Sequence, residues 1–477
     1  MNISEKAQAS NQPAPRASRR PAAVVALLLV AVGAAPALEP APPSAQTPFP
    51  DGTRWVAIGD SISQNGAYAH YVNVFYHTRY PERRIDLQNA GISGDTAAGA
   101  LRRYDWDILP HRATVATVML GMNDVGRSNY STVKPVQNAE QAKVAAMTAY
   151  QDTLKRLIER LRADGTAVTL LTPSIYDQTG TQKVESLVGV NDALGRCAIF
   201  ARQEAAALGL GLVEVHQPMT ERNRLLQAAD PAASIIGADR VHPGHPGHFF
   251  LAVQILQAQG VQSSVAQVAI DGADLRVTRS EHAQVQDLRR TPNGLEFTYR
   301  AQSLPFPIPR EVAPALPWTD FSAALNTERL AISGLPAGSW TLRIDGKAVG
   351  SWAAATWADG LDLAALPTTP QLAQAQDVAR LLGDRRGRMA SLRTLAYVEH
   401  TTPGAVVPAT LEAMEPLIAA RVAKLGPDHH YTRQTQAYRT AKPNEKILRQ
   451  EVESLLQAAQ EAAKPQPRTF VVERAVP

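Results

Sequence analysis

The chain contains a single cysteine, Cys197, among 477 residues. One cysteine excludes an intrachain disulfide, and it also excludes a cluster of thiolate ligands for a metal within one chain. A chain of this length can bury a large apolar core, so it needs no covalent cross-link to be stable. Cys197 lies in a segment with a helical pattern, and we expect it to be a small buried side chain rather than a nucleophile.

The sequence also lacks a strong excess of charge of one sign. It has 48 Lys and Arg against 44 Asp and Glu, and aromatic residues make up only 6%. Four of the basic residues and one acidic residue lie within the first 37, so the remainder is close to neutral. There is no basic stripe interleaved with aromatic residues, which argues against a nucleic-acid partner. We find no internal repeat.

No apolar run is long enough to span a membrane comfortably. The run at 22–32 falls short of the roughly 20 residues that a spanning helix needs. It follows Arg19 and Arg20 and precedes Ala35-Pro36-Ala37, the order of an export signal with its cleavage site. We therefore predict a signal peptide over 1–37, a periplasmic or extracellular location, and no stable membrane insertion after cleavage. Extending the run to Leu38 leaves an uncleaved anchor as the alternative.

A Pro-rich stretch over 38–50 reads as a linker, and after it short strands alternate with helices up to about residue 265. Each predicted strand is rich in Val, Ile and Leu, and the long helix over 139–163 has one apolar face formed by Val144, Met147, Tyr150, Leu154, Leu157 and Leu161. Alternating strands and helices predict an α/β fold, a parallel sheet covered on both faces, for residues 51–265. The predicted strands are 54–58, 84–88, 114–120, 167–171 and 211–215, and two further helices are predicted at 190–208 and 246–259.

The remaining residues, 266–477, have a different pattern that predicts an α+β accessory region. We expect a strand at 295–302, three short strands within 329–352, and a mostly helical tail over 370–464. The Pro-rich segment 303–317 is predicted to be a rigid linker or surface loop. This region contains Trp340, Trp352 and Trp357. We expect them to pack in the core, and a sugar-stacking surface is the alternative.

Small and polar residues follow the early strands, where functional groups of parallel sheets gather. Gly59-Asp60-Ser61 follows the first strand, Gly94 follows the second, and Asn123 follows the third. Asp239 and His242 precede the last helix of the domain. Ester hydrolysis by serine needs a hydroxyl, an imidazole, an orienting acid and oxyanion donors, and these residues supply all four. Taken one at a time, Gly94, Asn123 and Asp124 are better explained as turn residues, and their occurrence together with Ser61 and the Asp239–His242 pair favours the catalytic interpretation.

Four blocks in this order resemble the SGNH hydrolases, also called GDSL-type esterases: "GDS" at 59–61, Gly94 in "ISGDT", "GMND" at 121–124 and "DRVHP" at 239–243. Ile62 stands where the family often has Leu. The resemblance implies a three-layer α/β/α, flavodoxin-like domain that needs no cofactor and no metal. It also implies roles. Ser61 would be the nucleophile, His242 the general base and Asp239 its orienting acid. The backbone N–H groups of Ser61 and Gly94 and the amide of Asn123 would bind the oxyanion.

The substrate is less determined than the chemistry. The family includes carbohydrate O-deacetylases, and export with an accessory region favours an exported serine ester hydrolase that removes O-acetyl groups from a glycan through an acyl-enzyme. The alternatives are a lipase, a lysophospholipase or an arylesterase, and, from another class, a non-catalytic glycan-binding surface protein. Three residues close in sequence to the site blocks are candidate substrate contacts: Tyr68, Arg127 and Tyr176.

A histidine run offers a competing interpretation. His242, His245 and His248 could suggest a zinc site and a metal-dependent hydrolase, because imidazole is a common zinc ligand. Pro-Gly pairs at 243–244 and 246–247 interrupt the spacing that would put the three rings on one helical face. We therefore expect structural roles for His245 and His248, and also for His216 after the fifth strand.

Overall fold

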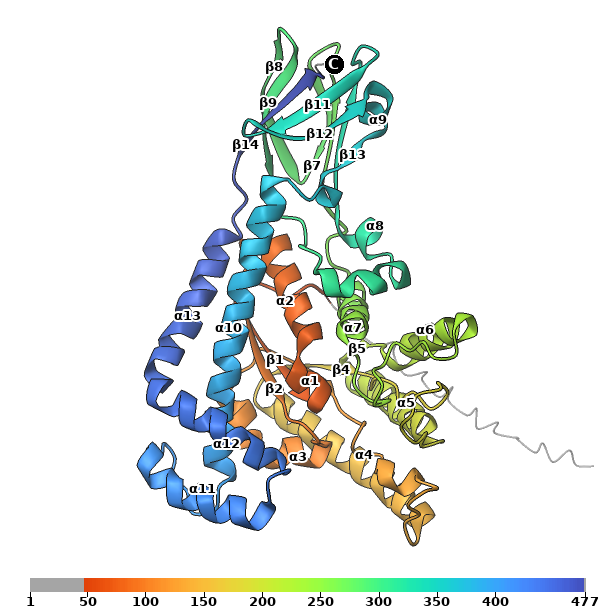
Figure 1. Ribbon diagram of the computed structural model, residues 1–477, viewed down its shortest axis with the longest axis vertical. Helices are drawn as coiled ribbons and strands as arrows, with labels where there is room; N and C mark the ends of the chain where they lie inside the picture. The colour runs from red at the N-terminus through yellow and green to blue at the C-terminus, as the bar shows by residue number, and fades with distance from the viewer. Residues whose placement is uncertain (1–46, 476–477) are drawn as a thin grey trace, which may run out of the picture. The chain divides into compact units, whose positions relative to one another are not determined.

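The computed structural model describes residues 47–475, so the predicted signal peptide over 1–37 lies outside the described residues. Five parallel strands form the central sheet, in the order β2-β1-β3-β4-β5 (Figure 1). This confirms the predicted α/β fold with a parallel sheet. The strands are β1 Thr53–Gly59, β2 Ile85–Gly91, β3 Val115–Met119, β4 Ala167–Leu171 and β5 Gly211–Val213.

Both faces of the inner strands are buried, which explains why β1, β3 and β4 are mostly apolar. Successive side chains of β1 alternate between the faces: Trp55 and Ala57 join one core, and Val56 and Ile58 join the other. The first core is covered by α2 (Ala67–Arg79) and α7 (His245–Ala258). The second is covered by helices with these bounds: α3 Ala97–Arg102, α4 Ala139–Ala163 and α5 Val190–Leu208.

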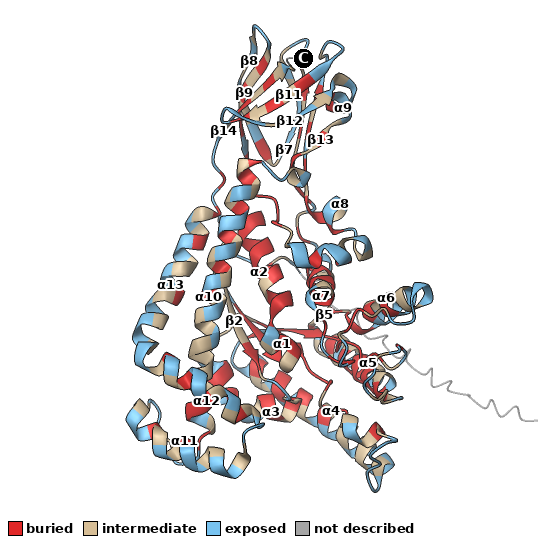
Figure 2. Ribbon diagram, in the orientation of Figure 1, coloured by how far each residue is buried: buried red, intermediate tan, exposed pale blue. Residues whose placement is uncertain are grey.

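Helices α4 and α5 have the predicted bounds, but one position of the predicted apolar face of α4 is wrong. Val144 is 69% exposed, because the buried positions of α4 begin only at Tyr150. Helix α2 was not predicted. All of its residues except His70 are buried, including the polar Asn73 and His77, so the helix has no exposed face (Figure 2). Three further helices of this domain were also missed: α1 Ser61–Asn65, α3 Ala97–Arg102 and α6 His216–Ala229.

Two Pro-rich segments are packed more deeply than their composition suggested. The segment 303–317 is not a surface loop, because Leu304 and Phe306 lie in the core beside α2 and α7. Its second half forms the 3-10 helix η4 (Arg310–Trp318). The end of the predicted linker 38–50 is likewise buried, since the ring of Phe49 stacks on Tyr76 with 4.8 Å between centroids. Apolar side chains between the prolines anchor both segments.

Beyond residue 263 two mostly antiparallel sheets enclose a separate core, distinct from the two cores of the central sheet. Their strand orders are β13-β10-β6-β7 and β12-β11-β14-β9-β8. The last described strand, β14, lies between β9 and β11 and was not predicted. Trp340 and Trp357 are buried in this core and Trp352 is partly buried against it, as expected for core packing. The strands are β6 Ser264–Asp271, β7 Arg276–Glu281, β8 Ala283–Thr291, β9 Gly294–Ala301, β10 Thr327–Ser333, β11 Ser339–Ile344, β12 Lys347–Ala353, β13 Leu361–Asp362 and β14 Arg468–Arg474.

Four helices connect β13 to β14, and the first of them packs on the central sheet. Arg385 of α10 (Pro370–Thr401) donates to Asp86 Oδ1 at 2.5 Å and to the Leu87 carbonyl at 3.2 Å, both on the outermost strand β2. Helix α10 thereby covers an edge that would otherwise be open to further pairing. No helix within 47–475 has the length and apolar character to cross a membrane. The other three helices are α11 Leu411–Leu425, α12 His430–Ala441 and α13 Glu445–Ala462.

Candidate active site

The predicted site residues gather where the strand order of the sheet reverses. Strands β1 and β3 are neighbours, while β2, which lies between them in sequence, pairs on the other side of β1. At such a point the loops leave in opposite directions and open a crevice at the carboxyl ends of the strands. Ser61 follows β1 there, and the segment 121–124 follows β3.

The turn from β1 into α1 explains the Gly-Asp-Ser order. A Cβ at Gly59 would lie 2.8 Å from the Met119 carbonyl oxygen, so only glycine fits beside β3. Asp60 caps α1, because its Oδ1 accepts a hydrogen bond from the Ile62 N–H at 3.0 Å. Burial raises the pKa of Asp60 to about 6. Ser61 is the first residue of α1, which places its side chain at the end of the sheet.

Ser61, His242 and Asp239 form one hydrogen-bonded chain. Ser61 Oγ lies 2.6 Å from His242 Nε2, and His242 Nδ1 lies 2.5 Å from Asp239 Oδ2. Burial opposes ionisation of Asp239, but hydrogen bonds from the His242 ring and from backbone N–H groups outweigh it, so its pKa lies below the usual value. An imidazole between a hydroxyl and a carboxylate is the arrangement that activates serine nucleophiles.

Arg240 holds the loop that carries this pair, and sequence reasoning missed it. The residue is buried, has a left-handed φ of +67°, and lies between Asp239 and Val241. Its backbone carbonyl accepts from the Asp177 N–H at 2.9 Å. The only sequence signal was its place inside "DRVHP". Its guanidinium donates to four carbonyls of the loop after β4: Asp177, Gly180, Gln182 and Val184.

Gly94 and Asn123 lie on the two loops beside the serine loop. Gly94 has φ +77°, a left-handed conformation that favours glycine. Asn123 Nδ2 donates to the Asp95 carbonyl at 2.9 Å, and its Oδ1 accepts from Arg127 Nη2 at 3.1 Å. Because a guanidinium only donates, this contact fixes which end of the amide is oxygen. The second Nδ2 hydrogen and the N–H groups of Ser61 and Gly94 have no acceptor within 47–475.

Asp124 joins those two loops. Its Oδ1 accepts from the Ala97 N–H at 2.8 Å and its Oδ2 from the Gly121 N–H at 2.9 Å, so one carboxylate connects the start of α3 with the end of β3. Burial raises the pKa of Asp124 to about 7. The sequence had suggested a plain turn residue at this position. Its spacing within "GMND" is the signal that it belongs to the site.

Two of the three candidate substrate contacts are wrong. Tyr68 is buried with its hydroxyl 2.9 Å from Ser63 Oγ, so its side chain belongs to the core. Tyr176 is also buried, and its hydroxyl donates to the Glu185 carbonyl while accepting from the Leu187 N–H. Arg127 is half-buried beside Asn123 and remains a candidate.

The other candidate histidines make contacts within the protein. His245 Nδ1 lies 2.8 Å from the Tyr71 hydroxyl, and the buried His248 ring stacks on Tyr68. His216 is buried at the start of α6, where its N–H donates to Thr172 Oγ1. In the described part of the chain, no group of three His, Cys, Asp or Glu side chains is arranged to hold a metal ion.

The fold and this site correspond to a known class of enzyme. Residues 57–248 match the model of the GDSL-like lipase/acylhydrolase family. That segment contains β1 through the start of α7 and every residue of the Ser61 chain. Residues 57–248 are therefore similar to this family, as their motifs indicated, and the match supports a carboxylic ester hydrolase.

Individual relatives extend the comparison. An acetylxylan esterase of Geobacillus stearothermophilus is 27% identical over 226 residues, which are 44% of this chain and 95% of that protein. The solved structure of BT4096, a gut microbial diltiazem-metabolizing enzyme, superposes with a TM-score of 0.83 and 28% identity over 91% of this chain and 100% of that one. The second match therefore extends beyond the family segment into the β-rich region and the C-terminal helices.

Proposed function

We propose that the protein is an exported serine esterase that removes O-acetyl groups from a carbohydrate. The observation that carries the proposal is the chain from Ser61 through His242 to Asp239, with contacts of 2.6 and 2.5 Å. The similarity to an acetylxylan esterase over 95% of its length supports acetyl and carbohydrate as the two halves of the ester. Export rests on the basic, apolar and small-residue order within 1–37.

In the proposed mechanism Ser61 Oγ attacks the carbonyl carbon of the ester while His242 Nε2 takes the hydroxyl proton. The carbonyl oxygen becomes an oxyanion, which the N–H groups of Ser61 and Gly94 and the amide of Asn123 stabilise. The C–O bond to the sugar then breaks, and His242 returns the proton to the departing alcohol. Water adds to the acetyl-enzyme by the same route, so acetate leaves and Ser61 regains its proton.

Asp239 contributes by holding one tautomer of His242. Its carboxylate accepts a hydrogen bond from Nδ1–H, which leaves Nε2 as the acceptor facing Ser61. When His242 becomes an imidazolium in the transition state, the same carboxylate stabilises the positive charge. The lowered pKa of Asp239 keeps it ionised across the neutral range.

A second substrate class follows from the other relative. The protein that superposes over 91% of this chain is described as a diltiazem-metabolizing enzyme, which favours a small aromatic ester as the alternative to a glycan. Lipid and longer acyl esters are the remaining options. The same serine mechanism hydrolyses carbohydrate, aromatic and lipid esters, so measured turnover of each ester is needed to distinguish these substrates.

The test is an ester panel on the wild type and Ser61→Ala: acetylated xylan, p-nitrophenyl esters of increasing acyl length, lysophospholipid and diltiazem. We expect acetate release from acetylated xylan, a fall in rate with acyl length, and no turnover by Ser61→Ala. A preference for long acyl chains, or turnover of diltiazem without acetylxylan, would overturn the carbohydrate assignment. The N-terminal residue of protein recovered from the cell envelope tests export, and we expect Leu38.

A further inference from the structure

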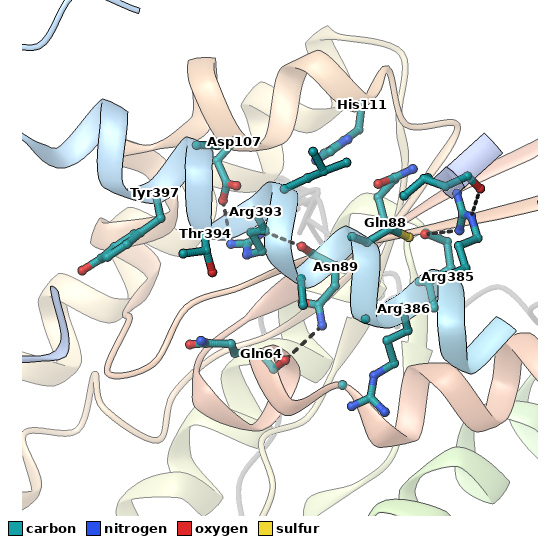
Figure 3. A pocket seen from close by; sticks show the side chains of 18 of the residues that line it. Gln64, Gln88, Asn89, Asp107, His111, Arg385, Arg386, Arg393, Thr394 and Tyr397 are labelled. Atoms are coloured by element: carbon teal, nitrogen blue, oxygen red, sulfur yellow. Dashed lines mark hydrogen bonds and ion pairs between the residues drawn. The ribbon is translucent and has the colours of Figure 1, made fainter. Parts of the chain in front are cut away.

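A large cavity lies beside the candidate active site, between α10 and the elements α1, α2 and β2 (Figure 3). Its volume is about 1020 Å³, just above the range of about 300–1,000 Å³ for small-ligand pockets. Ser61, Asp239 and His242 do not line it. Gln64 and Ile92 do, and they lie three residues after Ser61 and two residues before Gly94. The cavity therefore borders the loops that carry the nucleophile and one oxyanion donor.

One cation that lines the cavity, Arg386, lacks a carboxylate partner among the described residues. Arg385 pairs with Asp86 and Arg393 pairs with Asp107, so both of these charges are compensated. Arg386 is half-buried on the same helix and donates to the Asn65 carbonyl, and within 47–475 no carboxylate forms an ion pair with it. Figure 3 shows its side chain extending from α10 toward the ribbon that carries Gln64.

An unsatisfied acceptor lines the same cavity. Asn73 of α2 is only 4% exposed, and its Oδ1 has no hydrogen-bond partner among the described residues. A buried acceptor without a donor is costly, so a ligand hydroxyl that donates to it is favoured. The indole of Trp106 and the amide side chains of Gln64 and Gln434 also line the cavity. Amides beside aromatic rings suit a ligand that carries many hydroxyl groups on an apolar ring.

We propose that this cavity binds an acidic sugar unit of the glycan that presents its acetyl group to Ser61. The sugar carboxylate pairs with the Arg386 guanidinium, and a ring hydroxyl donates to Asn73 Oδ1. This inference rests on the proposed function, because it takes the substrate to be a glycan. It narrows the substrate class to acetylated glycans that carry uronic acid units close to the acetylated sugar.

The experiment measures binding without turnover. Calorimetric titration of the Ser61→Ala protein uses two probes, a xylo-oligosaccharide with one glucuronic acid branch and the same oligosaccharide without it. We expect the acidic probe to bind at least about tenfold more tightly, the value of a hydrogen-bonded charge pair. Arg386→Gln in the same background should abolish this difference. Arg380→Gln is the matched control, because Arg380 is exposed on the same helix and does not line the cavity.

A second measurement needs no substitution at Arg386. Free glucuronate should compete with the acidic probe for the Ser61→Ala protein, and glucose should not. Equal affinity for the two probes, an acidic preference that survives Arg386→Gln in a folded protein, or competition by both sugars would each overturn the assignment. Turnover of acetylated xylan by the wild type is measured separately. If the wild type does not turn over acetylated xylan but the Ser61→Ala protein binds the acidic probe selectively, the proposed substrate is rejected and the acidic-sugar site is retained.

Discussion

The carboxylate of Asp239 holds both the ring and the backbone of His242. Its Oδ2 lies 2.5 Å from Nδ1 of the ring, and its Oδ1 accepts from the His242 backbone N–H at 3.0 Å. The same Oδ1 accepts from the Val241 N–H at 3.0 Å. One side chain therefore sets the position of the loop and the tautomer of the imidazole, and this relationship makes Asp239 the first residue to test.

Asp239→Asn should lower kcat/KM on an acetyl ester by about 10- to 10⁴-fold. An amide lacks the charge that stabilises the imidazolium, and its NH2 group favours the wrong tautomer. His242→Ala should be at least as damaging. Circular dichroism melting controls for folding, since the backbone contacts to Oδ1 survive in the amide. Full activity in a variant that melts like the wild type would make Asp239 structural.

Asn123→Ala should lower kcat by about 10²–10³-fold and leave KM nearly unchanged, because an oxyanion donor acts mainly in the transition state. Arg127→Met should cost less, since its contact with Asn123 Oδ1 only orients the amide. The double variant then separates the two roles of Arg127. If Arg127 acts through Asn123, the double variant is no worse than Asn123→Ala. An additional rise in KM would instead identify Arg127 as a substrate contact.

Arg385→Leu should lower the free energy of unfolding by about 3 kcal/mol, because it breaks a largely buried ion pair. It also leaves the carbonyls of Leu87 and Val452 without this donor. The matched control is Arg388→Leu on the same helix, whose ion pair with Glu451 is about half exposed and should contribute less than about 1 kcal/mol. Urea titration measures both. Equal losses would mean that α10 does not stabilise β2 through Arg385.

Glu328 should make stability fall as the pH rises from 5 to 8. Its side chain is fully buried in β10, and burial raises its pKa to about 7. A raised pKa means that the folded state holds the proton more tightly. Its contribution to stability is therefore complete below about pH 4.5 and is lost as the pH passes through 7. The difference amounts to about 3 kcal/mol.

Glu328→Gln should reduce the pH dependence of the free energy of unfolding, even if the substitution also lowers stability at every pH. The measurement is the free energy of unfolding at pH 5, 6, 7 and 8 for both proteins. Glu281→Gln in strand β7 of the same sheet is the control, because a hydrogen bond from Arg279 lowers the pKa of Glu281 and keeps its titration below this range. A Glu328→Gln profile parallel to that of the wild type would contradict the raised pKa.

The amino-acid sequence alone determined the sheet, the two long helices and the candidate catalytic residues. The strands are short segments with Gly, Pro or Asn close to their ends, and helices α4 and α5 are followed by Asp164 and Gly209. Each of the four site blocks is a short run of consecutive residues, so the blocks can be recognised from their composition and their order along the chain. Such features depend on residues close in sequence, which is why they can be read without coordinates.

Only the tertiary structure decided which side chains are available to a ligand. Tyr68 and Tyr176 stand beside site blocks in the sequence, yet packing from other elements buries both. Neighbours surround helix α2, so its polar residues are buried together with its apolar ones. Arg385 reaches Asp86 across 299 residues of sequence, and that contact brings α10 over the edge strand and forms one wall of the proposed sugar cavity. Contacts at such separations depend on the fold as a whole, so no local pattern records them.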